Sequence, residues 1–554
     1  MLSCCLIVCK KSQPRQRDFS LFTLHSSLFT KQEKPPCPPR YRRIFQKNPA
    51  PNELISPFQR YNRRRRQLQR TTTITMNKES SYRHILKYTS LFGGVQGLNI
   101  LIGLVRNKVI AILLGPLGVG LISIYNTAVT FLQNSTNFGL QMSGVREISQ
   151  AFDSGDEAET IRHIALLRSW SILAAILGAA ICLFSCGILS QWAFSSYEYT
   201  GQFACLSIVV ALTAIAGGET AILKATRRLK ELAMTSVLGV LAALLVSVPI
   251  FLKWSYDGII PSIIVICIIQ MVLASWYSYR YYPPHFLTTW KQLREGKKMI
   301  SVGTAFVLAG VLGSGAEFAV RAYLSDMSVS LAGLYNAGYM ITMTYAGMVF
   351  AAMETDYYPH LSAVCHDTVK MNGAVNRQIE VSLMLIAPML VALMFCLKVL
   401  IPLLFSGKFL PVIGMTQIAV LAMYSRALSL PVSYILLAKG DSKSYLLMET
   451  VYDVLIVVSV VFGYTNWGLE GTGIALVITS FLHCVCVICY CMLRFGLDIK
   501  SSLMRNLLLQ FIIAIVSLMI VRNVDAFLYW FAACLAFALS SLLSWDMYNK
   551  TIRR

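Results

Sequence analysis

Hydrophobic stretches, each long enough to cross a bilayer, follow one another from Tyr88 to Met547 with short loops between them. A helix that spans the hydrocarbon core needs roughly 20 apolar residues, so the pattern predicts an all-α polytopic membrane protein with about 14 transmembrane helices. No segment between these stretches is long enough for a separate soluble domain, so the function has to be sought within the bilayer. The expected spans are Tyr88–Leu114, Leu117–Leu140, Ile164–Leu189, Gln202–Leu223, Met234–Leu252, Gly258–Tyr279, Met299–Val320, Leu331–Met353, Val381–Phe405, Val412–Ala438, Tyr445–Tyr464, Gly471–Leu493, Leu503–Ile520 and Ala526–Trp545.

The charge distribution predicts the orientation of these spans. The chain is 56% hydrophobic and 14% charged, and its net charge of +22 at first suggests a nucleic-acid partner. However, residues 1–75 hold 16 Lys/Arg and 3 Asp/Glu, so much of the excess precedes the spans. From Met76 onward, 23 Lys/Arg fall in the predicted cytoplasmic loops and tails and only 4 in loops on the opposite side. This bias predicts that both termini are cytoplasmic, and no nucleic-acid partner is expected.

Residues 1–75 are rich in Pro and Arg and lack any hydrophobic periodicity. Leu2–Cys9 is too short for the core of a signal peptide, and Lys10-Lys11 follows it in place of a cleavage site. Composition of this kind predicts a disordered extension. Two interpretations stay open: translation that begins at Met76, or a basic tail that binds anionic lipid.

The 15 cysteines do not predict a disulfide framework, because nearly all those after residue 75 lie in predicted helices, where Cys acts as a small hydrophobe. A cysteine run beside His483 resembles a metal site at first. At about 100° per residue, Cys484 and Cys491 share one helix face, while Cys486 and Cys489 share the opposite face. One ion cannot reach all four, so these residues are expected to pack, and no metal or other cofactor is expected.

The spans fall into two related halves. The predicted parts are an N-lobe (76–280), a basic cytoplasmic connector (281–298), a C-lobe (299–494) and a C-terminal helix pair (495–554). Residues 118–126 open the second span and match residues 328–336, which open the eighth, in Val, Leu and a closing aliphatic-Tyr-Asn. Because six spans separate the copies, both halves insert in the same orientation. This is the parallel-repeat arrangement of many secondary transporters, with the substrate site between the lobes.

Two motifs resemble those of a known family. Leu113–Gly120, LLGPLGVG, resembles the GPxGxG turn between the first two helices of Wzx-type O-antigen translocases. Ala352–Ser362, AMETDYYPHLS, is similar to the yyPxLS segment that closes the eighth helix of oligosaccharide flippases. Both belong to the multidrug/oligosaccharidyl-lipid/polysaccharide (MOP) exporter superfamily. The resemblance covers roughly Met76 to Arg494, and the final two spans are a departure from many members.

The resemblance implies a transporter of the bacterial inner membrane. Its implied activity is translocation of an undecaprenyl-pyrophosphate-linked O-antigen or related polysaccharide repeat unit from the cytoplasmic to the periplasmic leaflet, by alternating access between two lobes. The implied partners are the lipid-linked oligosaccharide, bilayer lipids, and a polysaccharide polymerase with other assembly proteins.

Basic residues inside the spans are candidates for binding the pyrophosphate, because an ionisable group in hydrocarbon normally faces a cavity or a partner. Arg426 lies near the midplane of the tenth span, and its planar fork suits paired hydrogen bonds to phosphate. The alternative is a structural Arg426 that pairs with a carboxylate such as Asp453. Arg106 in the first span is a second candidate, because the resemblance implies that the first and seventh helices line the lobe interface. Lys398, about two-thirds across the ninth span, is a third.

Glu449 and Asp453 lie four residues apart on the eleventh span, so both carboxylates project from one helix face. Two such groups in a low dielectric cannot both ionise freely, so one takes a proton or a cation lies between them. This predicts a site that couples transport to H+ or Na+. The alternative is a solvated Glu449, with Asp453 paired to Arg426.

Further charged residues near the span ends are candidates for coupling or gating. Glu317 and Arg321 are also four residues apart, near the end of the seventh span. Snorkelling to the headgroups would explain Arg321 without function. Glu219 lies near the cytoplasmic end of the fourth span, where we expect a gate or a solvated residue.

Amides on the second span are candidates for contacts with sugar hydroxyls. They are Asn126, Asn134 and Asn137. Hydrogen bonds between neighbouring helices are the alternative and commoner use of such residues.

Other function classes fit the sequence less well. An ATP-driven pump would need a phosphate-binding GxxxxGK[ST] loop, and none is present. A membrane polysaccharide polymerase or ligase is the enzyme alternative, but the longest predicted periplasmic loop, about Ser190–Gly201, has neither Arg nor His. A multidrug or cation exporter of the same superfamily is the closer rival. It predicts a cavity dominated by acidic residues, whereas this chain offers more basic candidates.

Overall fold

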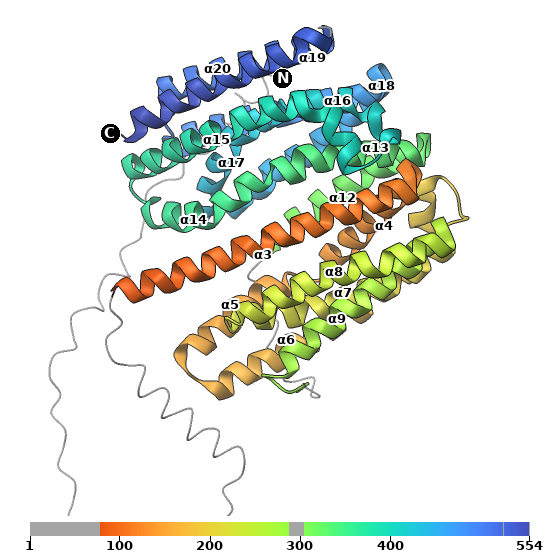
Figure 1. Cartoon of the computed structure of the whole chain (residues 1–554). Helices are drawn as coiled ribbons and strands as arrows, with labels where there is room; N and C mark the ends of the chain where they lie inside the picture. The colour runs from red at the N-terminus through yellow and green to blue at the C-terminus, as the bar shows by residue number, and fades with distance from the viewer. Residues whose placement is uncertain (1–77, 287–303, 524–525, 553–554) are drawn as a thin grey trace, which may run out of the picture. The chain divides into compact units, whose positions relative to one another are not determined.

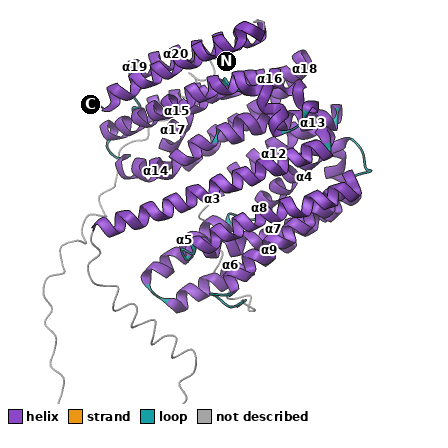
Figure 2. Ribbon diagram, in the orientation of Figure 1, coloured by secondary structure: helices purple, strands orange, loops and turns teal. Residues whose placement is uncertain are grey.

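The computed structural model describes residues 78–286, 304–523 and 526–552. All regular structure within these ranges is helical, and Figure 2 shows loops only as short connections. The all-α prediction is therefore confirmed. The chain divides into two units, Met1–Arg83 and His84–Arg554, and the second holds every element discussed below apart from the first residues of α3. The predicted extension over residues 1–75 lies outside the described residues.

The elements from α3 to α9 are called the first helix group here (Figure 1). They are α3 (Lys78–Leu113), α4 (Gly115–Thr136), α5 (Leu140–Ser154), α6 (Glu157–Phe194), α7 (Thr200–Ala225), α8 (Leu229–Trp254), the 3-10 turn η1 (Ser255–Gly258) and α9 (Ile259–Tyr279). The short α5 was not predicted. Gly139 and Gly155 border it with positive φ angles of 69° and 77°, conformations that glycine adopts without steric cost. The carboxylate of Asp156 then caps α6 by accepting a hydrogen bond from the Glu159 amide at 3.0 Å.

The second helix group runs from α12 to α18, and α19 and α20 follow it. The elements are α12 (Thr304–Met327), α13 (Val329–Tyr339), η2 (Met340–Ala346), α14 (Met348–Val364), α15 (Thr368–Leu404), the 3-10 turn η3 (Gly407–Val412), α16 (Ile413–Ala419), α17 (Ala422–Ala438), α18 (Ser442–Phe495), α19 (Ser501–Asn523) and α20 (Ala526–Ile552). The element η2 is a π-helix, a wider form that occurs mostly as single turns and often at functional sites.

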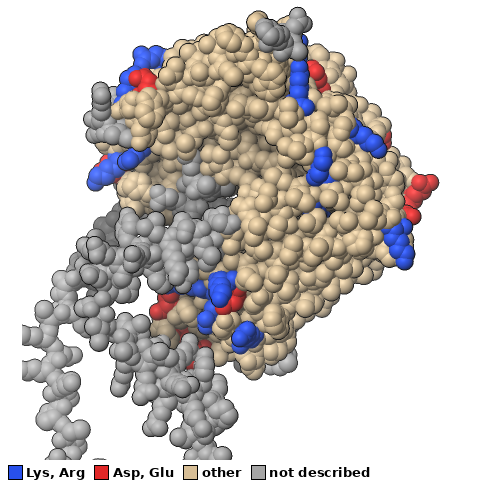
Figure 3. Space-filling view, viewed as in Figure 1, with Lys and Arg blue, Asp and Glu red and all other residues tan. Residues whose placement is uncertain are grey.

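Within the described residues, 9 helices are long and apolar enough to cross a membrane, or 10 if the bent pair formed by η3–α16 and α17 counts as one span. Figure 3 shows that most of the visible face carries neither acidic nor basic side chains, as lipid contact requires. The chain is a multi-pass membrane protein. The predicted number of 14 spans is not established by this count, in which a stretch of 51 and another of 54 residues each count once.

Both of these long stretches fold back on themselves. In α18, Trp467 and Gly468 leave helical geometry. The residues on either side then pair in antiparallel order: Tyr452 with His483 through rings 5.2 Å apart, and Ser444 with Tyr490 through a 2.6 Å hydrogen bond. The stretch over α8 and α9 turns at η1, and the Tyr281 hydroxyl beyond α9 donates to Glu231 near the start of α8 at 2.6 Å. Each stretch is therefore a helical hairpin rather than one long helix.

The two segments that match in the sequence cross each other where α4 meets α13. A Cβ added at Gly120 of α4 would overlap the Val329 carbonyl oxygen, and one added at Gly333 of α13 would overlap the Pro116 carbonyl oxygen. The backbones therefore touch directly, which only glycine permits. Further along α4, the Asn134 amide donates to the Gly310 carbonyl oxygen of α12 at 3.1 Å. The alternative use of this asparagine, a contact between helices, is the one the structure shows.

The C-terminal helix pair packs on α15 through polar as well as apolar contacts. The Tyr529 hydroxyl of α20 donates to the Phe395 carbonyl oxygen at 2.7 Å. Between α19 and α20, the buried Gln510 donates to the Ser540 carbonyl oxygen at 3.0 Å and accepts from the Ser540 hydroxyl at 2.7 Å. Such bonds hold helices together where apolar surface has no preference for protein over lipid.

We expect Gly120→Ala to destabilise the protein by about 1–3 kcal/mol, because the added methyl group must force α4 and α13 apart. Gly201→Ala on α7 is the matched control, since no atom lies within 4 Å of a Cβ added there. Thermal unfolding of both variants in detergent measures the difference. An unchanged unfolding temperature for Gly120→Ala would show that the crossing is not tightly packed.

Candidate functional site

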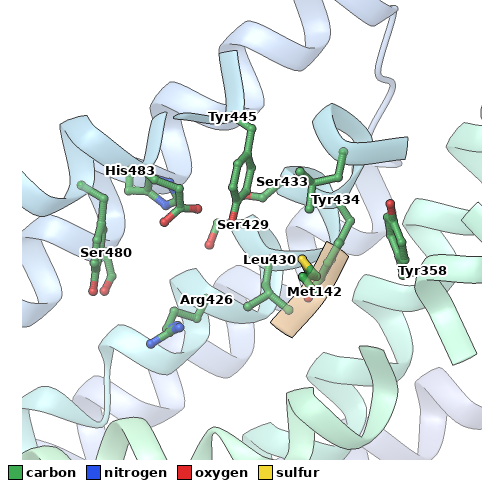
Figure 4. Close-up of a pocket in the computed structure, with 13 residues that line it drawn as sticks. Met142, Tyr358, Arg426, Ser429, Leu430, Ser433, Tyr434, Tyr445, Ser480 and His483 are labelled. Atoms are coloured by element: carbon green, nitrogen blue, oxygen red, sulfur yellow. The ribbon is translucent and has the colours of Figure 1, made fainter. Parts of the chain in front are cut away.

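A cavity of about 400 Å³ lies among α17, both halves of α18, the end of α14 and the start of α5. We call it the Arg426 pocket. It is lined by Met142, Tyr358, Arg426, Ser429, Leu430, Ser433, Tyr434, Leu437, Tyr445, Glu449, Tyr452, Ser480 and His483. Helical spacing explains much of this lining. Arg426, Ser429 and Ser433 recur at three- and four-residue intervals on α17, so their side chains share one face. Figure 4 shows this face opposite Ser480 and His483 of α18.

Arg426 is half-buried and contacts the π-helix η2. Its Nη1 atom lies 3.3 Å from the sulfur of Met343. No carboxylate among the described residues lies within 4.0 Å of its guanidinium, so the alternative of an Arg426–Asp453 ion pair is not found there. Glu449 lines the same pocket and interacts electrostatically with Arg426. The pocket thus holds one basic and one acidic group that have not closed into an ion pair.

A second polar site, the Asp453 cluster, lies next to the pocket between α12, α13 and α18. The Arg321 guanidinium lies 3.2 Å from the Glu317 carboxylate and donates to the Asn336 side chain at 3.3 Å. The Tyr339 hydroxyl donates to Glu317 at 3.2 Å. Asp453 faces the same cavity, whose volume is about 100 Å³.

Two members of this cluster have an unsatisfied buried atom among the described residues: Arg321 at Nε and Asp453 at Oδ2. Asp453 is only 9% exposed. A buried carboxyl oxygen without a partner is costly, so this atom is suited to hold a proton or to bind a cation. A Cβ added at Gly313 of α12 would lie 3.8 Å from both carboxyl oxygens, so this glycine leaves space beside them.

The structure separates the two carboxylates that the sequence placed on one helix face. Glu449 lines the Arg426 pocket, whereas Asp453 lines the cavity of the Asp453 cluster. Tyr452 lies between them in the chain and lines both cavities. Glu317 and Arg321, which were predicted independently, join Asp453 instead.

The other predicted substrate residues lie apart from the Arg426 pocket. Lys398 is exposed and places its ammonium group 4.5 Å from the Tyr529 ring of α20. Arg106 on α3 is half-buried near Cys267 of α9, and its Nε atom has no acceptor among the described residues. Asn126 is exposed on α4, and Asn137 is the C-cap residue that directly follows α4. The structure therefore does not assemble the predicted set of pyrophosphate-binding cations around Arg426.

Glu219 is buried and has a charged partner, so it is not the solvated residue that the sequence suggested as one possibility. It is buried in a two-pronged ion pair with Arg168 of α6, with N–O distances of 2.8 and 3.1 Å. The same guanidinium donates to the Ser278 hydroxyl at 3.2 Å and to the carbonyl oxygens of Tyr282 and Pro283 at 3.0 and 2.8 Å. This network, which we call the Arg168 knot, ties α6, α7 and α9 to the first residues after α9.

Sequence reasoning missed several of these residues. Arg168 was not selected, although an arginine at the fifth residue of a predicted span is the same kind of signal that selected Arg426. The tyrosines of the pocket gave no usable signal, because aromatic residues are common on every span. His483 was noted only beside the cysteine run, where packing was expected; the structure places its ring at the pocket wall.

The spanning helices, with a pocket and a buried charged cluster among them, define the class of protein as a multi-pass membrane protein with polar groups inside its helix bundle. The sequence profile of the family described as polysaccharide biosynthesis protein matches residues 109–414, more than half of the chain. The chain belongs to this family. A search of curated protein sequences finds no match.

Solved structures with a similar fold are transporters. The lipid II flippase MurJ, in an inward closed conformation, is 14% identical with a TM-score of 0.60, over 84% of this chain and 100% of that one. A multidrug resistance MATE family transporter of the MOP superfamily, inward-facing, is 15% identical with a TM-score of 0.60, over 74% of this chain and 96% of that one. A MOP superfamily transporter from Pyrococcus furiosus is 14% identical with a TM-score of 0.55, over 74% and 96%. The protein therefore has the MOP transporter fold, as the motifs had suggested.

We expect Glu219→Ala to destabilise the protein by about 3–5 kcal/mol, because it leaves the Arg168 guanidinium buried without its counter-charge. The control is Asp153→Ala, which removes the partner of Arg227 from an ion pair whose side chains are 50% and 68% exposed, against 3% and 2% for Glu219 and Arg168. Exposed pairs contribute about 0–1 kcal/mol, so the control is expected to unfold near the wild-type temperature. Equal shifts for both variants in a thermal unfolding assay would contradict the structural role of the knot.

Proposed function

We propose that this protein translocates a lipid-linked glycan across the inner membrane of a bacterium. The proposed cargo is an undecaprenyl-pyrophosphate-linked O-antigen or related polysaccharide repeat unit, moved from the cytoplasmic to the periplasmic leaflet. The observation that carries the proposal is the Arg426 pocket. In a chain of the polysaccharide biosynthesis family, it is a polar cavity among spanning helices with room for a small hydrophilic group.

Alternating access between the two helix groups is the proposed mechanism. Met142 of the first group reaches the Arg426 pocket, whose other lining comes from the second group. A change in the angle between the groups would therefore change how far the pocket is covered. The contact of Arg426 with η2 supports the same mechanism, because π-helical turns often mark functional sites. The proposed partners are bilayer lipids, a polysaccharide polymerase and other assembly proteins.

The Asp453 cluster is proposed as the coupling site. Asp453 binds H+ or Na+ in this proposal, and Glu317 and Arg321 set the local charge around it. Tyr452 lines both this cavity and the Arg426 pocket, which supports communication between them. Glu449 is proposed to act on the pocket side of the same helix.

A multidrug or cation exporter is the second candidate. The specific observation in its favour is the presence of three carboxyl groups, Glu317, Glu449 and Asp453, in the two adjoining cavities. A cationic drug would be attracted to such groups. The family match favours the glycan, and the experiment below separates the two candidates.

We expect Arg426→Ala to reduce glycan translocation at least about tenfold, the equivalent of 1.4 kcal/mol of lost interaction with the cargo. The assay is the amount and sidedness of lipid-linked glycan in native cells, detected with a membrane-impermeant lectin after depletion of the wild-type protein. Arg377→Ala, which removes an exposed cation from α15, is the matched control and is expected to complement fully. Full activity of a well-folded Arg426→Ala variant would contradict the assignment. If depletion leaves the amount and sidedness of the glycan unchanged, and expression of the protein increases ethidium efflux, the exporter is favoured.

We expect Asp453→Asn to abolish the dependence of transport on the coupling ion, because the amide can neither release a proton nor supply a negative charge. Translocation in membrane vesicles is measured while either the pH gradient or the sodium gradient is varied. Asp326→Asn is the control, since this exposed carboxylate lies at the end of α12 outside both cavities. A gradient dependence in Asp453→Asn that equals that of the wild type would rule out this residue as the coupling site.

A further inference from the structure

Aromatic rings lie on two sides of the Arg426 pocket. Tyr358 and Tyr434 form one pair, with ring centroids 5.6 Å apart. Tyr452 and His483 form another, with centroids 5.2 Å apart. In Figure 4, Tyr358 and Tyr434 lie on the side of the pocket opposite His483. Tyrosine combines an apolar ring face with a polar hydroxyl, so these walls suit a ligand that has apolar faces and polar edges.

Two buried polar atoms of the pocket lack partners within the described parts of the chain. They are the Nε2 atom of His483 and the hydroxyl oxygen of Ser480. Ser480 is 2% exposed, so leaving its hydroxyl unpaired costs free energy. Both residues line the cavity, and a neutral imidazole and a hydroxyl each bond well to an alcohol, which both donates and accepts. The unpaired atoms therefore point to a ligand rich in hydroxyl groups.

The charge of the pocket does not suit a pyrophosphate. Among the lining residues that the structure describes, Arg426 is the only Lys or Arg, and Glu449 shares the cavity with it. A pyrophosphate carries several negative charges, and moving them out of water requires matching cations or many charge-assisted bonds. Lys398 and Arg106, which were expected to help, lie elsewhere. One guanidinium and one carboxyl instead suit an uncharged ligand that donates to Glu449 and accepts from Arg426.

We propose that the Arg426 pocket is a subsite for one uncharged sugar unit of the glycan rather than for its pyrophosphate. The sugar packs its ring faces between the Tyr358–Tyr434 pair and the Tyr452–His483 pair. Its hydroxyl groups bond to Arg426, Glu449, Ser480 and His483. A cavity of about 400 Å³ is in the size range of small-molecule sites and holds a monosaccharide unit. This assignment rests on the proposed function, because it concerns a part of the same cargo.

Calorimetry of the full-length protein in lipid nanodiscs tests the subsite. The probes are methyl glycosides of neutral hexoses and N-acetylhexosamines, each titrated up to about 100 mM, and inorganic pyrophosphate as the competitor. We expect at least one glycoside to bind with a Kd in the millimolar range and pyrophosphate not to displace it. Tyr452→Ala and His483→Ala are expected to weaken this binding at least about tenfold.

The controls separate a local effect from misfolding. Tyr197→Ala removes a tyrosine that is 69% exposed and does not line the pocket, and it is expected to leave binding unchanged. Ser480→Ala removes only a hydroxyl and serves if the larger truncations fail to fold. Binding of pyrophosphate that depends on Arg426, or no binding of any glycoside, would overturn the subsite.

Failure of the subsite and failure of the proposed function give different results. If cells depleted of the protein accumulate cytoplasm-facing glycan but no glycoside binds, the flippase stands and the subsite is wrong. If a glycoside binds and its binding falls in Tyr452→Ala, but depletion leaves the glycan undisturbed, the subsite stands and the cargo must be sought elsewhere.

Discussion

Hydrocarbon offers no water to satisfy a buried polar group, and this constraint decides where every charged side chain of the spans lies. Arg168 meets it completely, with a carboxylate, a hydroxyl and two carbonyl oxygens around one guanidinium. Arg321 meets it with Glu317 and Asn336, although its Nε atom has no acceptor within the described residues. Asp453 leaves an oxygen unpaired. The fraction of its hydrogen bonds that is satisfied thus separates the structural Arg168 knot from groups such as Asp453, which can still bind a ligand or an ion.

The sequence predicted the fold well because the signal for a spanning helix is local. Length and apolarity suffice for it, and the motifs LLGPLGVG and AMETDYYPHLS suggested the MOP fold that the solved structures share. The short α5 was not predicted because the expected elements were identified by the length of a membrane span, and α5 is too short for one. The break at Trp467 and Gly468 was anticipated as a loop, since the apolar pattern stops there.

The candidate site was predictable only in part, because the depth of a residue in a span does not give the direction in which it points. Arg426 and Lys398 carried the same signal, yet one lines the pocket and the other lies against Tyr529 of α20. Glu449 and Asp453 share a helix face by spacing, but neighbouring helices divide that face into two cavities. Glu219 was expected to be a gate or a solvated residue, and the approach of Arg168 from another helix could not be inferred from either residue alone. Partners across helices are set by packing angles, which single-sequence periodicity does not contain.

The Arg168 knot has a consequence for where the first helix group ends. A rigid group ends at the last residue that is bound to its body, rather than at its last helical residue. The carbonyl oxygens of Tyr282 and Pro283 are bound to a side chain of α6, so these residues travel with the first helix group although they lie beyond the end of α9 at Tyr279. The first helix group therefore extends mechanically past its last helix, at least as far as Pro283, and one buried guanidinium sets this extension.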